Sequence, residues 1–143
     1  MIHNIDHVTI AVKNLEEAKR FFNLFNFKEV IAVEIEGQEM SNFMGIPDLK
    51  ASHVTLSLEN SNPSFEIQLL KFHNPTNEHP TPPGLNKTGF NHICFKVDNI
   101  TQEIKRLKAN NVVFLNDIMD FHNKKLIFIK GPDNTVIELA EYK

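Results

Sequence analysis

The sequence has a single cysteine, Cys94, and no tryptophan. One cysteine cannot close an internal disulfide, a usage typical of reducing compartments, so the sequence predicts a cytoplasmic protein. A basic-then-apolar start is missing, and no apolar run approaches the ~20 residues that a membrane helix needs. We therefore expect neither a signal peptide nor a partner membrane.

A strong excess of charge is also lacking. The formal net charge is −3 and the lysines are scattered along the chain, which excludes the basic face expected of a nucleic-acid-binding protein. The 143 residues, 41% of them hydrophobic, are enough for one core of ordinary size and too few for two independent average domains. We expect one compact domain over residues 1–143.

The most informative feature that is present is an internal repeat. Residues 5–15 and 90–100 each place a histidine in an alternating stretch and an asparagine seven positions later. The two histidines, His7 and His92, and the two asparagines, Asn14 and Asn99, are related by one constant offset of 85 positions (92 − 7 and 99 − 14). A constant offset predicts a duplicated unit.

A second pair of segments supports the duplication. Residues 67–72 and 137–142 match in type at all but one position, with a polar residue between two aliphatic ones, at an offset of 70 positions (137 − 67). The smaller offset predicts that the second half has lost loop length between its histidine strand and its last strand. Each half is therefore expected to consist of one strand, one helix and three strands.

Local patterns give the bounds of these elements. Alternation predicts strands over 5–12, 27–36, 53–58, 65–72, 90–97, 112–118, 124–130 and 134–142, and capping signals predict helices starting after Asn14 and Asn99. Residues 38–49 are interpreted as a loop pinned to the core by its apolar side chains, with a lid over a ligand as the alternative. Four of the seven prolines lie in 73–87, so half-units 1–73 and 89–143 are expected to be joined by a linker, 74–88.

Strand alternation also decides which side chains share a face. His7, His92, Gln68 and Glu138 each alternate with aliphatic neighbours that face the helices. Each of these four strands therefore sends one side chain of a metal-ligating type to the face without helices. If the two sheets curve together, two imidazoles, one amide and one carboxylate would converge in a cleft.

This combination resembles the vicinal oxygen chelate superfamily, which includes glyoxalase I, methylmalonyl-CoA epimerase, extradiol dioxygenases, and the fosfomycin and bleomycin resistance proteins. The resemblance covers essentially the whole chain, and residues 92–94 and 97–100 look closest to the epimerase. It implies an α+β fold in which two tandem βαβββ half-units form a curved mixed sheet around a metal-binding cleft. It also implies a small-molecule substrate and, together with the unpaired edges of open sheets, a homodimer.

The resemblance further implies that His7, Gln68, His92 and Glu138 bind a divalent metal ion, with zinc, nickel, cobalt, manganese and iron all compatible with such ligands. Glyoxalase I generally has glutamate where this chain has Gln68, and glutamine cannot accept a proton. Glu66 points the same way and would replace Gln68 if the register slipped by two, but the repeat aligns Gln68 with Glu138.

One carboxylate and three neutral ligands leave positive charge on a divalent ion, which can polarise a carbonyl group. This favours an isomerase or lyase of the glyoxalase or epimerase type, acting through a metal-stabilised enolate on a substrate with vicinal oxygens. Glu138 would be both ligand and base, and His53 and Glu66 are the candidates for a second base.

Two other functions stay open. The first is an Fe(II) ring-cleaving dioxygenase that uses only His7, His92 and Glu138. Its extradiol relatives usually carry a tyrosine ahead of the glutamate ligand, whereas the single tyrosine here, Tyr142, lies behind it. The second is a non-catalytic binding protein of the bleomycin-resistance kind, which often lacks the metal ligands that this chain keeps.

Overall fold

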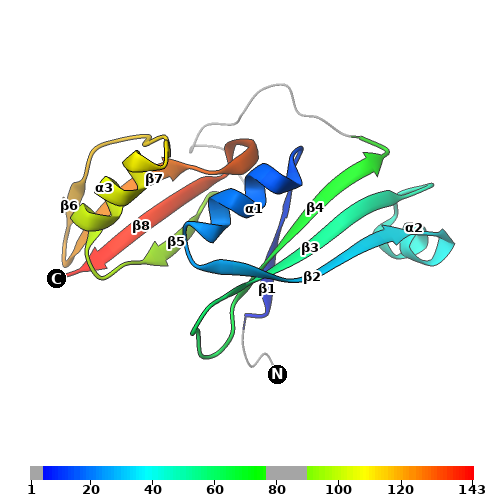
Figure 1. The fold of residues 1–143 in the computed structure, drawn as a ribbon, viewed down its shortest axis with the longest axis horizontal. Helices are drawn as coiled ribbons and strands as arrows, with labels where there is room; N and C mark the ends of the chain where they lie inside the picture. The colour runs from blue at the N-terminus through cyan, green and yellow to red at the C-terminus, as the bar shows by residue number, and fades with distance from the viewer. Residues whose placement is uncertain (1–4, 77–89) are drawn as a thin grey trace. The chain divides into compact units, whose positions relative to one another are not determined.

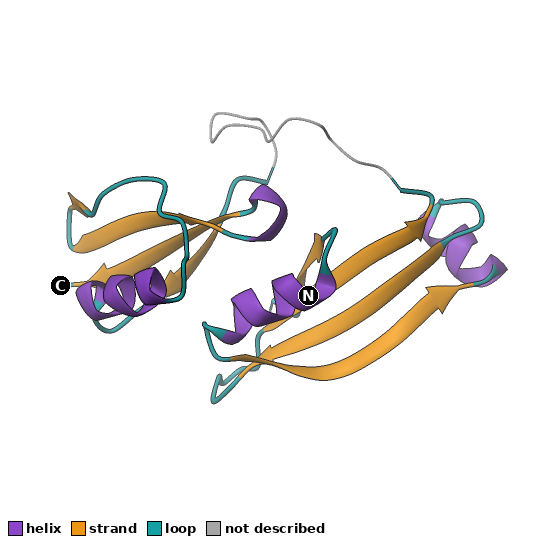
Figure 2. Cartoon of the chain, turned by 45° about the horizontal axis from the view of Figure 1, so that its top comes forward, coloured by secondary structure: helices purple, strands orange, loops and turns teal. Residues whose placement is uncertain are grey.

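The computed structural model describes residues 5–76 and 90–143 and divides the chain into two units, Met1–His79 and Pro80–Lys143. The boundary between the units falls inside the predicted linker, most of which lies outside the described residues. Figure 1 shows the ribbon, and Figure 2 distinguishes its helices from its strands. We describe each unit by itself.

Unit 1 contains a four-stranded mixed sheet and two helices (Figure 1). In chain order its elements are β1 (His7–Ala11), α1 (Leu15–Asn23), β2 (Phe27–Glu36), α2 (Gln38–Met44), β3 (Lys50–Leu58) and β4 (Glu66–Asn74). The strand order is β1-β4-β3-β2, with β1 parallel to β4 and the other pairs antiparallel.

Unit 2 repeats this plan on a smaller scale (Figure 2). Its elements are β5 (Ile93–Lys96), α3 (Ile100–Ala109), β6 (Met119–Phe121), β7 (Lys124–Lys130), the short 3-10 helix η1 (Pro132–Asn134) and β8 (Val136–Tyr142). The strand order β5-β8-β7-β6 matches that of unit 1, and again only the first pair is parallel.

The sequence explains why each helix starts where it does. Asn14 precedes α1 and its side chain accepts a hydrogen bond from the Glu17 backbone N–H at 3.1 Å, while Asn99 does the same for Gln102 at 2.9 Å before α3. Both side chains satisfy N–H groups that lack a partner within the helix. The predicted helix starts are therefore confirmed.

Burial follows the predicted alternation. In unit 1 the core contains α1 side chains such as Phe22 together with aliphatic residues of the sheet, including Ile10, Ile67 and Leu69. The alternate residues of β1, which are His7, Thr9 and Ala11, are exposed on the other face. The buried face of the sheet thus fixes the register of its strands, because a slip of one residue would turn their aliphatic side chains toward solvent.

The strand registers confirm the internal repeat at the level of single residues. Thr9 lies opposite Gln68 in the parallel pair of unit 1, and Cys94 lies opposite Glu138 in that of unit 2. Cys94 follows Thr9 by 85 positions (94 − 9) and Glu138 follows Gln68 by 70 (138 − 68), the same two offsets as in the sequence. Gln68 and Glu138 therefore occupy equivalent places in the two sheets.

Two element predictions are wrong. Residues 38–49, expected as a loop, begin with helix α2, which Gly37 (φ 94°) and Gly45 (φ 67°) bracket in conformations that glycine adopts at little cost. The buried Ser41 hydroxyl accepts a hydrogen bond from the Leu49 N–H and holds the helix to the chain that follows. A helix of seven residues is too short to show a clear period in the sequence.

The strand expected over 112–118 is reduced to one bridge between Phe114 and Ile129. Its pairing with β7 ends early because the Asn116 side chain, rather than a backbone carbonyl, accepts the next hydrogen bond, from the Phe128 N–H. The strand expected over 90–97 is also shorter, since β5 begins only at Ile93. The strands expected over 27–36 and 124–130 are confirmed with the same bounds.

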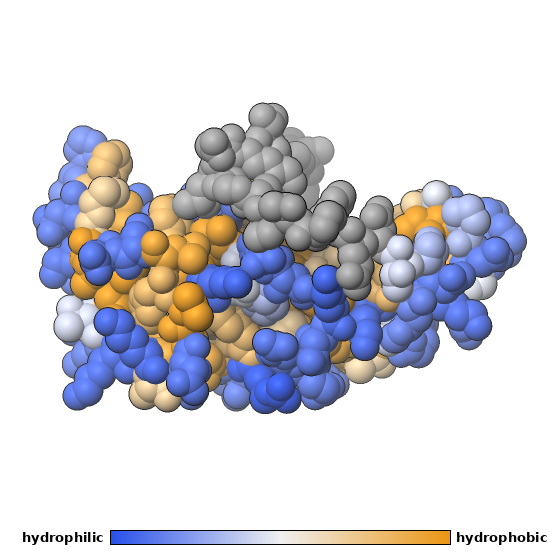
Figure 3. Space-filling view, turned by 90° about the horizontal axis from the view of Figure 1, so that it is seen from above, coloured by the Kyte–Doolittle hydropathy of each residue, from blue (hydrophilic) through white to orange (hydrophobic). Residues whose placement is uncertain are grey.

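Exposed apolar side chains occur in both units. Figure 3 shows hydrophobic atoms reaching the surface of unit 2, at the left of that view. In unit 1 the exposed apolar residues Val30, Ile31 and Val33 lie on β2, which ends its sheet. Within the described parts of the chain, no helix has the length and hydropathy needed to span a membrane.

Candidate metal centre

Unit 2 brings two of the predicted ligands into contact. The His92 Nε2 atom lies 3.2 Å from the Glu138 Oε2 atom. Glu138 lies in the middle of β8, and its side chain is 13% exposed. His92 immediately precedes β5, the strand that pairs with β8. Parallel pairing of β5 with β8 thus places an imidazole beside a largely buried carboxylate.

Asn91 decides which nitrogen of His92 faces that carboxylate. The Asn91 Oδ1 atom lies 2.8 Å from His92 Nδ1, and an amide oxygen can only accept, so Nδ1 carries the proton. In the neutral ring, Nε2 then presents its lone pair to Glu138. At 3.2 Å the two atoms can form an ion pair when the ring is protonated, or bind one cation together when it is neutral.

The separation of the two atoms suits a shared cation. Two ligand atoms bound at about 2.1 Å are about 3.0 Å apart at an octahedral angle and about 3.4 Å apart at a tetrahedral one. The observed 3.2 Å lies between these values. The donor set of unit 2 therefore fits a divalent metal ion.

An aromatic side chain holds the His92 ring in place. The Phe128 ring packs edge-on against it, with centroids 5.2 Å apart and planes at 75°. Phe128 lies on β7 directly opposite Glu138, so it borders both members of the pair. This packing limits the rotation of the imidazole and keeps water from part of the site.

Unit 1 presents the same arrangement around His7. The Asp6 Oδ2 atom lies 2.6 Å from His7 Nδ1, which again leaves Nε2 available as a ligand atom. The His7 side chain is 36% exposed. Among the described residues, no three His, Cys, Asp or Glu side chains gather closely enough to hold an ion by themselves.

Sequence reasoning missed the roles of Asp6 and Asn91. Each contacts Nδ1 of the histidine that follows it, and Asn91 follows Asp6 by the repeat offset of 85 positions (91 − 6). Metal-ligating histidines commonly donate their second N–H to a carboxylate or carbonyl oxygen, which fixes the tautomer. The constant offset of two oxygen-bearing side chains was the signal that could have revealed them.

The remaining unit 1 candidates share one face of the sheet. Glu66 lies directly opposite His7, and Gln68 lies two residues further along, opposite Thr9 on β1 and Thr55 on β3. Because residues paired across strands point to the same face, all of these side chains face away from α1. Gln68, rather than Glu66, has the place that Glu138 has in unit 2.

His53 belongs to the same face. It pairs with Leu70 on β4, two residues beyond Gln68, and with Val33 on β2. Its Nδ1 atom is buried and has no hydrogen-bond partner among the described residues. Buried polar atoms are normally satisfied, so this ring nitrogen is available to a group that reaches the sheet from outside.

Cys94 faces Glu138 but is not a thiolate. Desolvation of its thiol, followed by a hydrogen bond to Glu138, raises the pKa of Cys94 to about 11. The residue as a whole is nevertheless exposed by surface area. At neutral pH, without a bound metal ion, the thiol is therefore protonated and is not a nucleophile.

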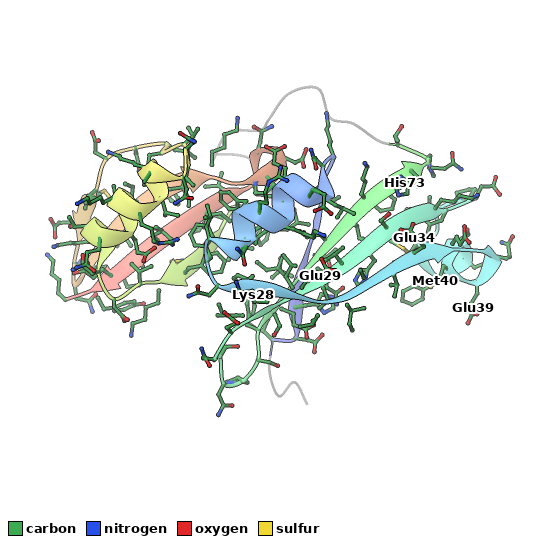
Figure 4. All side chains as sticks on the ribbon, viewed as in Figure 1. Lys28, Glu29, Glu34, Glu39, Met40 and His73 are labelled. Atoms are coloured by element: carbon green, nitrogen blue, oxygen red, sulfur yellow. The ribbon has the colours of Figure 1, made fainter. Side chains whose placement is uncertain are left out.

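A second polar cluster lies on the opposite face of the unit 1 sheet. The Ser52 hydroxyl oxygen lies 2.7 Å from Glu34 Oε1 and 2.7 Å from His73 Nε2 (Figure 4). Ser52 alternates with His53 along β3, so the cluster faces away from the candidate ligands. It links β2, β3 and β4, and it places His73 outside the candidate metal site.

Comparison with known families covers nearly the whole chain. Residues 6–140 match the family described as Glyoxalase/Bleomycin resistance protein/Dioxygenase superfamily. This range contains all four predicted ligands.

Three curated relatives have similar sequences. Glyoxalase I of Saccharomyces cerevisiae is 31% identical over 139 residues, which are 93% of this chain and 36% of that protein. Lactoylglutathione lyase of Schizosaccharomyces pombe is 29% identical over 96% of this chain and 47% of its own length. Mitochondrial methylmalonyl-CoA epimerase of Mus musculus is 27% identical over 96% of this chain and 72% of its own. The chain thus spans less than half of each yeast protein.

Solved structures share the fold. A glyoxalase family protein of Bacillus cereus superimposes with a TM-score of 0.88 at 22% identity, covering 99% of this chain and 95% of that one. The fosfomycin resistance protein FosX of Listeria monocytogenes has a TM-score of 0.67 at 18% identity, covering 100% and 96%. A variant of FosX in complex with Mn(II) and 1S,2S-dihydroxypropylphosphonic acid has a TM-score of 0.64 at 19% identity, covering 100% and 95%.

The family match, the repeated half-units and the shared fold agree with one another. The chain therefore belongs to the Glyoxalase/Bleomycin resistance protein/Dioxygenase superfamily, that is, to the vicinal oxygen chelate proteins.

Proposed function

We propose that this protein is a divalent-metal-dependent isomerase or lyase of the glyoxalase or epimerase kind, acting on a small substrate with vicinal oxygens. The observation that carries the proposal is the contact between His92 and Glu138, in which Nε2 lies 3.2 Å from a carboxylate oxygen, a spacing that two ligands of one divalent ion also have. His7 and Gln68 are proposed to complete the ligand set, since they hold the equivalent places in the repeat.

The relatives support this class of reaction. The curated proteins that resemble the chain are a glyoxalase I, a lactoylglutathione lyase and methylmalonyl-CoA epimerases, and the epimerase matches extend over 96% or more of the chain. Their names indicate lyase and isomerase chemistry. The Mn(II) complex of FosX supports a divalent cation as the cofactor, while nitrogen and oxygen ligands suit manganese, iron, cobalt, nickel and zinc alike.

Glu138 is the residue proposed to move the proton. When bound, the metal ion acts as a Lewis acid that polarises a substrate carbonyl and acidifies the neighbouring C–H group. Glu138 directs one oxygen, Oε2, at His92 and also accepts a hydrogen bond from Cys94, and a remaining lone pair of the carboxylate is proposed to take the proton from that carbon. The electron pair of the C–H bond moves toward the carbonyl, and the return of the proton to a carbon completes the turnover.

His53 and Glu66 are proposed as alternatives for a second base. Epimerisation needs a proton to return to the opposite side of the carbon, and Gln68 cannot carry it. Both candidates lie on the face that carries Gln68, and His53 has a buried ring nitrogen without a partner among the described residues. A neutral imidazole nitrogen of this kind can accept and return one proton.

Metal content tests the ligand set. We expect purified protein to bind about one divalent ion per chain, and the His7→Ala, His92→Ala double variant to lose it, because removing ligands opens the coordination shell. Elemental analysis measures the content, and a His73→Ala, His122→Ala variant is the control for general histidine binding. Unchanged metal content in the double variant would rule out the proposed centre.

Incorporation of solvent deuterium into the substrate tests the reaction. The metal-loaded protein would be incubated in D₂O with methylmalonyl-CoA, with the methylglyoxal–glutathione hemithioacetal and with a catechol in parallel. Deuterium at the α-carbon of the first supports epimerase action, and lactoylglutathione from the second supports glyoxalase action. Oxygen uptake with the catechol, without exchange elsewhere, would instead support the ring-cleaving dioxygenase.

We also propose that the protein is a homodimer. β2 ends the first sheet, and its outer edge has no strand partner within the described residues, so its backbone N–H and C=O groups are free to pair with another chain. Sedimentation is the test, and a 16.4 kDa species alone at micromolar concentration would contradict the proposal. The cytoplasmic location stays a prediction from cysteine usage.

A further inference from the structure

The candidate ligands of unit 2 share their sheet face with several lysines. Lys96 lies two residues beyond Cys94 on β5, and Lys124 lies opposite Tyr142 on β7. Since residues paired across strands and alternate residues along a strand share a face, both lysines point to the side of the sheet that carries Glu138. The acidic residues Asp120 and Glu141 alternate to the other face.

The two lysines meet at one aromatic ring. The Lys124 Nζ atom lies 4.6 Å from the Tyr142 ring centroid, and the Lys96 Nζ atom lies 5.3 Å from the same centroid. Because β8 lies between β5 and β7, the two ammonium groups approach this ring from the two neighbouring strands, each at a distance typical of a cation–π contact. Two cations and a phenol hydroxyl form a ready set of hydrogen-bond donors.

Within the described residues no carboxylate forms an ion pair with either lysine, although the charge of Glu138 acts on Lys124 across the same face. The ion pairs of unit 2 join Arg106 to Glu103, Lys143 to Asp120 and His92 to Glu138, and neither Lys96 nor Lys124 takes part in any of them. A hydrogen bond with Tyr142 raises the pKa of Lys124, so this lysine stays charged at neutral pH. The face thus keeps two unpaired positive charges on the same sheet surface as the candidate ligands.

We propose that Lys96, Lys124 and Tyr142 form an oxyanion-binding subsite, and that the substrate carries a phosphate or carboxylate group away from its chelating oxygens. The identity of this group as part of a substrate rests on the proposed function. The subsite itself consists of residues other than the candidate metal ligands. The expected substrate is therefore a bifunctional acid, with vicinal oxygens at one end and an anionic group at the other.

The spacing along the strands sets the length of such a substrate. On β8, Glu138 and Tyr142 are four residues apart, which corresponds to about 13 Å along the strand, and the level of Lys96 lies about half as far from Glu138. Lysine side chains are long and flexible, so their ammonium groups can reach back toward the ligand pair. A chain of five or six carbons with an anion at its far end fits this interval.

Three sugar acids test the proposal with the full-length, Mn²⁺-loaded protein. Gluconate has an α-hydroxycarboxylate at one end and a neutral hydroxymethyl group at the other. Glucarate has a second carboxylate at that far end, and 6-phosphogluconate has a phosphate there. We expect at least one of the two bifunctional acids to bind about tenfold more tightly than gluconate in calorimetry, the ratio that one net charge-assisted hydrogen bond supplies. Which of the two gains more identifies the anion.

Variants locate the effect. In the Lys96→Gln, Lys124→Gln protein the preference over gluconate should disappear, and the Lys96→Arg, Lys124→Arg protein should retain it. The matched control is Lys108→Gln, Lys125→Gln, which removes the same charge from a lysine stacked on Phe114 and from one on the opposite face of the sheet. Equal binding of all three acids to the wild type, or an equal loss in the control, would overturn the subsite.

A metal-free measurement separates this proposal from the proposed function. Inorganic phosphate added to metal-free, ¹⁵N-labelled His92→Ala protein should shift the amide signals of residues 94–96, 124–126 and 140–142. Shifts there combined with a failure to bind metal in the wild type would contradict the proposed function and support the subsite. Normal metal binding without these shifts would contradict the subsite alone.

Discussion

The two half-units have the same strand order and the same capping asparagines, yet their site faces differ in charge. Unit 2 sets a carboxylate, Glu138, against His92, whereas unit 1 has the neutral Gln68 at the equivalent place. Near these positions unit 2 adds two lysines and a tyrosine, and unit 1 adds Glu66 and His53. One sheet plan has therefore been kept for folding, while each face carries its own chemistry.

This difference teaches which part of a duplicated fold is free to change. The aliphatic residues that alternate with the site residues are buried in both units, and replacing one would leave a cavity. The residues on the other face pack against less of their own unit. They can diverge at little cost in stability, and in this chain they have become an amide in one unit and a carboxylate in the other.

The largest effect is expected from exchanging the carboxylate for an amide. Glu138→Gln should lower metal affinity by about 100-fold or more, because the site loses its one anionic ligand, while Gln68→Ala should cost less because a neutral ligand is lost. Competition with a chromogenic chelator measures both affinities. Similar losses in the two variants would mean that the two units contribute alike.

The next effect concerns the residues that orient the histidines. Asn91→Ala and Asp6→Ala should each reduce metal affinity about 10- to 100-fold, since each frees the Nδ1 proton that sets the histidine tautomer. Asn91→Asp, which keeps the acceptor, should retain affinity. NMR of the imidazole nitrogens distinguishes the two tautomers, and an unchanged tautomer in Asn91→Ala would contradict this role.

A smaller effect is expected from the contacts that hold the start of α3, because this helix has a second cap from β8. The start of α3 is held by Asn99 and by Glu141 of β8, whose carboxylate accepts from the Ile100 N–H at 2.6 Å. Glu141→Ala should lower the free energy of unfolding by about 1 kcal/mol, the cost of losing a helix cap. Urea denaturation measures it, with Glu39→Ala, an exposed glutamate in the first turn of α2, as control. An equal loss in the control would point to general charge effects.

The smallest effect is expected at Lys19, which links α1 to β2. Its hydrogen bonds, first to Glu16 and then to Glu29, raise the pKa of Lys19 above the ordinary value of 10.5. The ion pairs therefore stabilise the fold below that ordinary value and stop doing so as pH rises through the raised pKa. Lys19→Met should cost a few tenths of a kcal/mol at neutral pH and nothing well above the raised pKa. A pH-independent loss would assign the effect to packing.

The amino-acid sequence by itself determined the duplication, the helix caps and the face on which each candidate ligand lies. These features follow from local rules, because alternation in a strand and an oxygen-bearing side chain before a helix act within a few residues. The constant offsets then made His7, His92, Gln68 and Glu138 equivalent in pairs before any contact was known. Two strands were predicted with their observed bounds for the same reason.

Only the tertiary structure decided which residues far apart in the sequence come into contact. The 3.2 Å contact of His92 with Glu138 depends on the register of β5 against β8, 44 positions apart (137 − 93), which no local pattern contains. The same holds for the meeting of Lys96 and Lys124 at Tyr142 and for the replacement of a backbone acceptor by Asn116 that ends a strand early. Such contacts depend on which strands pair, because side chains far apart in the chain meet only after the sheet has formed.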